Sequence, residues 1–305
     1  MSKILVTTYM NPDLDGTASI LAYAELLKSQ GEEAEGKLFG APQPEVLFFS
    51  SKLGYSFPIG DEKELVQWDS LVIVDTSSTK RLSKQIDPKK VVEIIDHHPA
   101  ETGEEFPVAK IQNEEVGATA TLVYERIEKA GLELEEKLAN LIYLAIFHNS
   151  TNLLSGADER DLRVISELEK KYGFKREAVG EMFDYASSYI LDNFEAVVLG
   201  DLKEIETVHG LCVAGQIELY DAFSPKYEIV AKSKAIVEKL KAERGTLVLM
   251  MVTDIKENRT GIYTDSPEIQ EALSKSLGLT FSGGWAYSQP MTKRKKVLNL
   301  LKKEG

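Results

Sequence analysis

Cysteine and histidine are scarce in this chain. Its 305 residues include one cysteine, Cys212, and four histidines. A single cysteine excludes an internal disulfide framework and a zinc cluster held by several thiolates, so we expect Cys212 to be a core residue in a reducing compartment. Any metal site must then be built from oxygen and imidazole ligands.

Basic residues are outnumbered by acidic ones, and long hydrophobic runs are scarce. The chain has 36 basic against 49 acidic residues, a formal net charge of −13, which opposes general attraction to nucleic acid. The apolar run near the N-terminus is too short for a signal peptide or a membrane span. We therefore expect a cytoplasmic protein without a membrane segment, which meets any polyanionic substrate with a local basic patch or a metal.

Three short apolar runs are predicted to be buried strands that end in acidic residues. They are Lys3–Tyr9, which leads into an acidic loop, Leu71–Asp75 and Val91–Asp96. Helical periodicity lies between and after them, at 15–29, 44–52, 80–85, 117–129 and 135–146. This alternation predicts an α/β domain with a mostly parallel sheet flanked by helices, in which ligands bind outside the carboxyl ends of the strands.

The pattern changes after two charged helices at 158–172 and 176–191. The following residues predict a smaller α+β domain, with strands at 196–207, 211–217, 246–253 and 260–263 and helices at 226–244 and 267–277. We place the first domain at 1–188 and the second at 189–305.

Acidic and imidazole side chains gather at the predicted strand ends. Asp13 and Asp15 follow the first strand, Asp75 ends the second, and Asp96-His97-His98 ends the third. Asp15 could instead be a simple helix N-cap with Asp13 solvated, and adjacent histidines can be incidental. A site built from Asp13, Asp15, Asp75 and His97 suits two divalent cations that activate a water for attack on phosphorus.

These motifs resemble the DHH phosphoesterase superfamily, and more narrowly the family II (manganese-dependent) inorganic pyrophosphatases and exopolyphosphatase-related proteins. The matching segments are Asn-Pro-Asp-Leu-Asp at 11–15, Val-Asp-Thr-Ser-Ser at 74–78 and Asp-His-His at 96–98. The resemblance implies a DHH-type first domain, a DHHA2-type second domain and a homodimer. It implies a hydrolase of a small phosphoanhydride or phosphoester, pyrophosphate or polyphosphate first, with Mn²⁺, or Mg²⁺ or Co²⁺, as cofactor.

The resemblance also implies roles for individual residues. Asp13 would bind a first metal, Asp15 and His97 a second, and catalytic Asp75 both, while His98 would contact the substrate phosphate or protonate the leaving group. In the second domain it implies that the substrate's phosphates are bound by Lys203, Arg294, Lys295 and Lys296. A basic run such as 293–296 is equally typical of a solvated helix face.

Two positions depart from the family pattern. Tyr9 stands where the family has a metal-binding histidine, and a protonated phenol is a poor ligand at neutral pH. Asn149 stands in place of a metal-binding aspartate. The neighbouring His148 is either a compensating metal ligand or a hydrogen-bonded residue at a helix end. These departures leave open a catalytically weakened phosphate- or nucleotide-binding or regulatory homologue, or a phosphodiesterase acting on short nucleotides.

Overall fold

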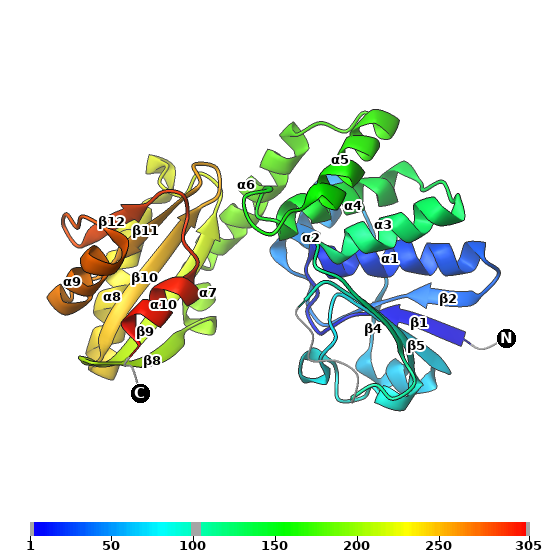
Figure 1. Ribbon diagram of the computed structural model, residues 1–305, viewed down its shortest axis with the longest axis horizontal. Coiled ribbons are helices and arrows are strands. Elements are labelled where there is room, and N and C mark those ends of the chain that lie inside the picture. Colours follow the sequence, from blue (N-terminus) through cyan, green and yellow to red (C-terminus); the bar gives the residue numbers. More distant parts are fainter. Residues whose placement is uncertain (1–2, 99–104, 303–305) are drawn as a thin grey trace. The chain divides into compact units, whose positions relative to one another are not determined.

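The computed structural model describes residues 3–98 and 105–302, and the chain divides into two compact units, Met1–Met182 and Phe183–Gly305 (Figure 1). The division falls within helix α6 (Glu177–Asp192). Among the described residues no helix combines the length and apolar character needed to cross a membrane.

The first unit is built on a five-stranded sheet with the order β2-β1-β5-β6-β7. Every neighbouring pair in it runs parallel. Its strands are β1 (Lys3–Thr7), β2 (Glu33–Gly36), β5 (Ser70–Val74), β6 (Val91–Asp96) and β7 (Lys110–Asn113). Since β1, β5 and β6 are neighbours with one direction, their carboxyl ends meet at a single edge of the sheet.

Helices and connecting segments cover this sheet. Helices α1, α3, α4 and α5 lie in layers along one of its faces (Figure 1). The other face carries an apolar cluster that includes Leu65, Trp68, Leu82 and Ile86. The helices are α1 (Leu14–Ser29), α2 (Pro44–Leu53), α3 (Thr119–Ala130), α4 (Glu136–Asn149) and α5 (Glu159–Tyr172). The connections hold a small parallel pair, β3 (Leu38–Phe39) and β4 (Ile59–Gly60), and short 3-10 helices at Glu62–Gln67, Thr79–Arg81 and Pro88–Lys90.

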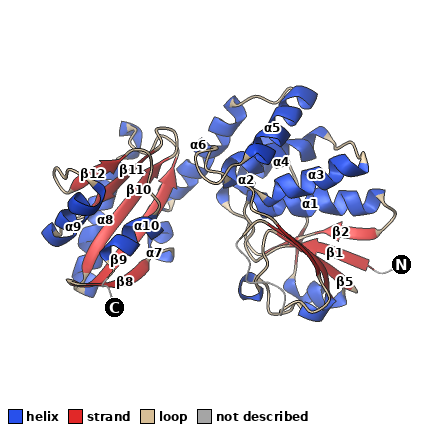
Figure 2. Ribbon diagram, viewed as in Figure 1, coloured by secondary structure: helices blue, strands red, loops and turns tan. Residues whose placement is uncertain are grey.

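The second unit is a mixed sheet with helices on both faces (Figure 2). Its order is β12-β11-β10-β9-β8, and β9 and β10 are parallel while the other neighbours are antiparallel. The strands are β8 (Lys203–Thr207), β9 (Gly210–Leu219), β10 (Leu247–Asp254), β11 (Arg259–Tyr263) and β12 (Trp285–Ser288). The helices are α7 (Phe194–Gly200), α8 (Ile229–Arg244), α9 (Pro267–Leu277) and α10 (Arg294–Leu301).

Cys212 is a core residue of this second unit. Its side chain is fully buried among apolar residues, and burial raises its thiol pKa to about 11. A thiol in this state is neither a metal ligand nor a nucleophile at neutral pH, in agreement with the sequence prediction.

The predicted fold class is confirmed, with differences in a few elements. The strand expected at 196–207 is wrong in its first half, because Phe194–Gly200 forms helix α7. Val197 and Val198 favour a strand by propensity, but Phe194 and Val198 stand four residues apart and are both buried, which is helical spacing. The helix expected at 80–85 is a single 3-10 turn, Thr79–Arg81. Strands β2, β7 and β12 were not predicted, since they are short edge segments with little apolar alternation.

Candidate metal centre at the carboxyl ends of three strands

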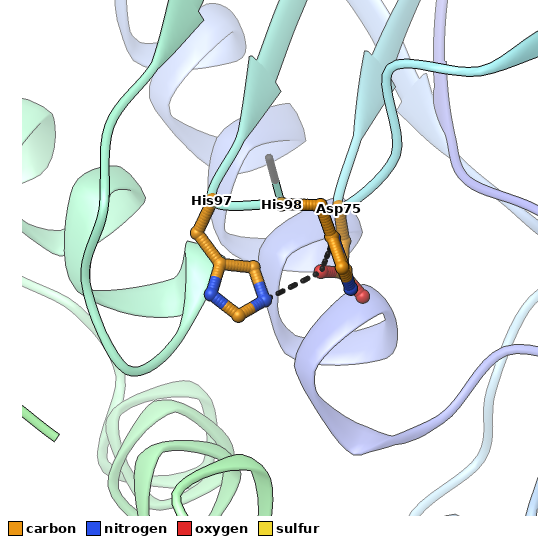
Figure 3. A group of neighbouring side chains, drawn as sticks. All are labelled: Asp75, His97 and His98. Carbon is orange, nitrogen blue, oxygen red and sulfur yellow. Dashed lines mark ion pairs between the residues drawn. The ribbon is translucent and has the colours of Figure 1, made fainter. Parts of the chain in front are cut away.

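Asp75, His97 and His98 bring three potential ligand atoms within 4.8 Å of one another (Figure 3). Asp75 directly follows β5 and adopts a left-handed backbone conformation with φ +60°. Aspartate adopts this conformation more readily than most residues, and the turn directs its carboxylate toward the two histidines that follow β6. The histidine nitrogens lie 3.6 Å (His97 Nε2) and 3.8 Å (His98 Nδ1) from Asp75 Oδ1.

The Asp75 carboxylate is buried and surrounded by other acids. Its side chain is 2% exposed, and Thr119 Oγ1 donates a 3.1 Å hydrogen bond to Oδ1. Burial first, and then the charges of Asp15, Asp13 and Asp96, raise the pKa of Asp75 well above its ordinary value. A nearby cation would remove the cost of holding this charge.

His97 presents a lone pair to these acids. Its Nδ1 lies 2.8 Å from the Val116 carbonyl oxygen, which can only accept, so Nδ1 carries the proton. In the neutral ring Nε2 is then the unprotonated nitrogen, and it lies 3.6 Å from Asp75 Oδ1, 3.8 Å from Asp15 Oδ2 and 3.1 Å from Asn149 Nδ2. Two ligands that bind one ion at about 2.1 Å stand roughly 3–4 Å apart, so His97 Nε2 is spaced to share a divalent cation with either carboxylate.

His98 is oriented differently, by Asp96. His98 Nδ1 lies 2.9 Å from Asp96 Oδ1, which also accepts from the backbone N–H groups of His97 and His98. Burial raises the pKa of Asp96, but hydrogen bonds from His98 and Ser77 outweigh it and lower that pKa, so the carboxylate stays charged. The His98 ring is half-exposed, and its Nδ1 side is directed to Asp96.

Asp15 is fixed by the first turn of α3. Its side chain is fully buried, and the backbone N–H groups of Thr119 and Ala120 each donate a 2.8 Å hydrogen bond to it. Burial has the largest effect on the pKa of Asp15, and together with the charge of Asp13 it raises this pKa to about 6. His97 and the two backbone hydrogen bonds oppose the shift. Asp15 thus has a fixed orientation beside His97.

The side chains of Asp13 and Tyr9 are hydrogen-bonded to each other. The N-cap of α1 is Asp13 and not Asp15, because the helix begins at Leu14 and Asp13 accepts a 3.0 Å hydrogen bond from the backbone N–H of Gly16. The Tyr9 hydroxyl is also hydrogen-bonded to Asp13, and burial first, then the charges of Asp75 and Asp13, raise the phenol pKa far above its ordinary value. The phenol stays protonated, so this side of the site offers a hydrogen bond in place of an imidazole ligand.

Asn149 presents its amide nitrogen to the cluster. Its Nδ2 lies 2.8 Å from the Gly117 carbonyl oxygen, 3.2 Å from Asp15 Oδ2 and 3.1 Å from His97 Nε2. The Gly117 oxygen can only accept, so it fixes which end of the amide faces the ligands. An amide nitrogen that donates hydrogen bonds is not a metal ligand, and with one of its two hydrogens donated to Gly117 the other is left for Asp15 Oδ2 or His97 Nε2.

The other sequence-predicted residues make contacts of their own. His148 Nε2 lies 3.7 Å from Oε2 of buried Glu45, whose pKa is raised by burial. In the second unit Asp201 joins two predicted residues: its carboxylate lies 3.6 Å from Lys203 Nζ and 2.7 Å from Arg294 Nη2. Lys295 and Lys296 are exposed on the first turn of α10.

Three residues that support the cluster were not assigned roles from the sequence. They are Asp96, Thr119 and Asp161. Asp161, in the first turn of α5, accepts hydrogen bonds from Gly117 N (2.7 Å), Thr121 Oγ1 (2.5 Å) and Asp158 N (2.8 Å). It therefore holds the segment whose amides fix Asp15. Only the capping pattern Asp-Glu-Arg-Asp at 158–161 hinted at a structural role for Asp161.

Asp161→Ala is expected to lower the free energy of unfolding by about 3 kcal/mol, because it leaves buried N–H and O–H donors without acceptors. It should also weaken Mn²⁺ binding roughly tenfold, since the Asp15 support is loosened. Chemical denaturation and calorimetry measure the two effects. The control is Glu159→Ala, an exposed change in the same helical turn. Equal stability of the two variants would contradict the assigned role.

The raised pKa of Asp15 predicts the pH dependence of the metal-free protein. A folded-state pKa of about 6 against an ordinary 3.8 means that the folded state holds this proton more tightly. The unfolding free energy should therefore fall by about 3 kcal/mol in total as the pH rises from about 4 to above 6. Thermal unfolding in chelator across this range tests it. Asp15→Asn should show a smaller slope, and stability that rises with pH in this window would contradict the assignment.

Comparison with known proteins identifies relatives for the whole chain. Residues 3–146 match the model described as DHH family, N-terminal domain. The manganese-dependent inorganic pyrophosphatase of Bacillus subtilis is 26% identical over 299 residues, covering 97% of this chain and 96% of that protein.

Two solved structures share the fold. One is a candidate family II inorganic pyrophosphatase of Methanococcus jannaschii, with a TM-score of 0.66, 23% identity and coverage of 98% of this chain and 99% of that chain. The other is an exopolyphosphatase-related protein from Bacteroides fragilis, with a TM-score of 0.53, 14% identity and coverage of 98% and 90%.

Proposed function

We propose that this chain, whose residues 3–146 match the model described as DHH family, N-terminal domain, is a metal-dependent phosphohydrolase that cleaves a small phosphoanhydride, with pyrophosphate or polyphosphate as the first candidates. The resemblance that the motifs at 11–15, 74–78 and 96–98 indicate is confirmed by this match and by the similarity to manganese-dependent inorganic pyrophosphatases. The observation that carries the proposal is that His97 Nε2 lies 3.6 Å from Asp75 Oδ1 and 3.8 Å from Asp15 Oδ2, with His98 Nδ1 3.8 Å from the same Asp75 oxygen.

The donor set fits a divalent cation. Two carboxylates and an imidazole, with no thiolate, suit Mn²⁺ and also Mg²⁺ or Co²⁺. Asp15, Asp75 and His97 are the residues that would hold it. When bound, such an ion lowers the pKa of a coordinated water and polarises phosphoryl oxygens. Thr119 and the α3 amides keep the two carboxylates oriented, and Val116 keeps the His97 tautomer that presents Nε2.

His98 is proposed to meet the substrate. Asp96 Oδ1 lies 2.9 Å from His98 Nδ1 and orients the half-exposed ring. An imidazole N–H in this position can donate to a phosphate oxygen or protonate the leaving group. We propose that Lys203, Arg294, Lys295 and Lys296 of the second unit, a DHHA2-type domain, bind the substrate's phosphates, the first two aligned by Asp201. The homodimer and the cytoplasmic location remain predictions.

A second candidate function is phosphate or nucleotide binding without efficient turnover. It is favoured by the contacts of Tyr9 and Asn149. The hydrogen bond from Tyr9 to Asp13 and the amide of Asn149 occupy positions where relatives are expected to have ligands. These contacts reduce the number of negatively charged or imidazole ligands, and with it the number of cations that the cluster can hold.

Phosphate release separates these functions. The full chain is assayed with pyrophosphate, tripolyphosphate, long polyphosphate and a dinucleotide, in separate Mn²⁺, Mg²⁺ and Co²⁺ buffers. Release from a phosphoanhydride that Asp75→Asn abolishes is the expected result. Faster release from the dinucleotide favours a phosphodiesterase. No release from any compound, with phosphate binding retained, favours the binding protein.

A further inference from the structure

The Tyr9 ring carries an exposed cation on its face. The guanidinium carbon of Arg81 lies 3.8 Å from the centroid of the ring. The hydroxyl of the same ring is hydrogen-bonded to Asp13, and the charges of Asp75, Asp13 and Arg81 all act on it. One aromatic side chain thus places a guanidinium next to the acidic cluster, and the stacking favours this position.

Backbone contacts also position Arg81. It ends the 3-10 turn Thr79–Arg81, six residues after Asp75, and its carbonyl oxygen accepts a hydrogen bond from the backbone N–H of Met10 (3.4 Å). Met10 follows Tyr9 directly, so the segments that carry the ring and the guanidinium are joined at this point. The Arg81 side chain is exposed and forms no ion pair or side-chain hydrogen bond with any residue in the described ranges.

We propose that Arg81, stacked on Tyr9, is a specificity-determining residue that binds a phosphate group of the substrate beside the metal centre. The identity of the ligand as a phosphate compound rests on the proposed function. A guanidinium is always protonated, and its planar fork matches two phosphate oxygens at once. Within residues 3–98 and 105–302 its N–H groups form no hydrogen bond, so none with these residues has to break when an anion binds.

A cation at this position would offset the negative charge of the acidic cluster. Asp13, Asp15, Asp75 and Asp96 gather at one sheet edge, and together they repel a polyanion. The protonated Tyr9 phenol contributes no imidazole ligand, which limits the metal charge on its side of the site. A guanidinium stacked on that phenol supplies a fixed positive charge in the same place.

Calorimetric titration of inorganic phosphate into the full-length, Mn²⁺-loaded protein tests this role. Arg81→Gln should weaken phosphate binding by about 10–100-fold, as expected for loss of a charge-assisted hydrogen-bonding pair. Arg81→Lys, which keeps the charge and loses the fork, should fall between this variant and the parent. The matched control is Lys84→Gln, which removes an exposed cation three residues further along the same connection and should change affinity less than about twofold. Mn²⁺ stoichiometry should be the same in all four proteins.

Three results would overturn the assignment: parental phosphate affinity in Arg81→Gln, an equal loss in Lys84→Gln, or a loss of Mn²⁺ binding in Arg81→Gln. Phosphate release from pyrophosphate and tripolyphosphate separates this inference from the proposed function. A parent that releases no phosphate, with phosphate binding still weakened in Arg81→Gln, rejects the hydrolase and supports Arg81. If the parent hydrolyses these compounds and Arg81→Gln has the same KM, the hydrolase is supported and the role of Arg81 is rejected.

Discussion

Asp75→Asn is expected to abolish tight Mn²⁺ binding and to reduce phosphate release by about 10³-fold or more, because it removes the carboxylate that faces both histidines. Asparagine has nearly the same shape and tolerates the φ of +60° at this position, so the backbone turn should persist. The loss can therefore be attributed to the charge and not to misfolding.

The same substitution should stabilise the metal-free protein. Burial and the neighbouring acids raise the pKa of Asp75, which means that its ionised form is unfavourable at neutral pH when no cation is bound. Removing that charge should raise the unfolding temperature in chelator by a few degrees. Asp69→Asn, an exposed change at the opposite end of β5, is the matched control.

Opposite changes in metal affinity and metal-free stability are the signature of this prediction. Calorimetry with Mn²⁺, phosphate release and thermal unfolding with and without chelator measure the three quantities. A variant that still binds Mn²⁺ as tightly as the parent would contradict the placement of the cation beside Asp75.

Asn149→Asp is expected to have the opposite effects: stronger Mn²⁺ binding and a less stable metal-free protein. A carboxylate in place of the amide adds a charged ligand beside His97 Nε2, and Mn²⁺ affinity should increase on the order of 100-fold or a further ion should bind. Calorimetric titration gives both the affinity and the number of ions. The readout does not depend on turnover.

In chelator this variant should be less stable than the parent. The new carboxylate would stand where the amide nitrogen now lies 3.2 Å from Asp15 Oδ2 and 2.8 Å from the Gly117 oxygen, so repulsion replaces hydrogen bonds. The expected loss is about 2–4 kcal/mol of unfolding free energy. Asn152→Asp makes the same charge change three residues later, in the turn after α4, and should alter neither quantity measurably. Unchanged metal affinity in Asn149→Asp would show that position 149 does not face the cation.

The strand-end acids were predictable from the sequence because their signals are local. A short apolar run that ends in Asp75 or in Asp96-His97-His98 specifies both a buried strand and the chemical type of the residues that follow it. The common direction of such strands then places these residues at one edge, as the parallel pairing of β1, β5 and β6 shows. The two-part α/β and α+β architecture follows from the same local periodicity.

Side-chain orientation was decided only by contacts between distant residues. Asp15 is held by amides 104 and 105 residues further along the chain, and the Asn149 amide is oriented by Gly117. The support from Asp161 and the stacking of Arg81 on Tyr9 likewise join separate segments. Sequence patterns report the period of an element and the chemistry of its residues. The direction of a lone pair or an N–H depends on which remote groups fold against it, and that is why the tertiary structure alone showed how this metal centre is arranged.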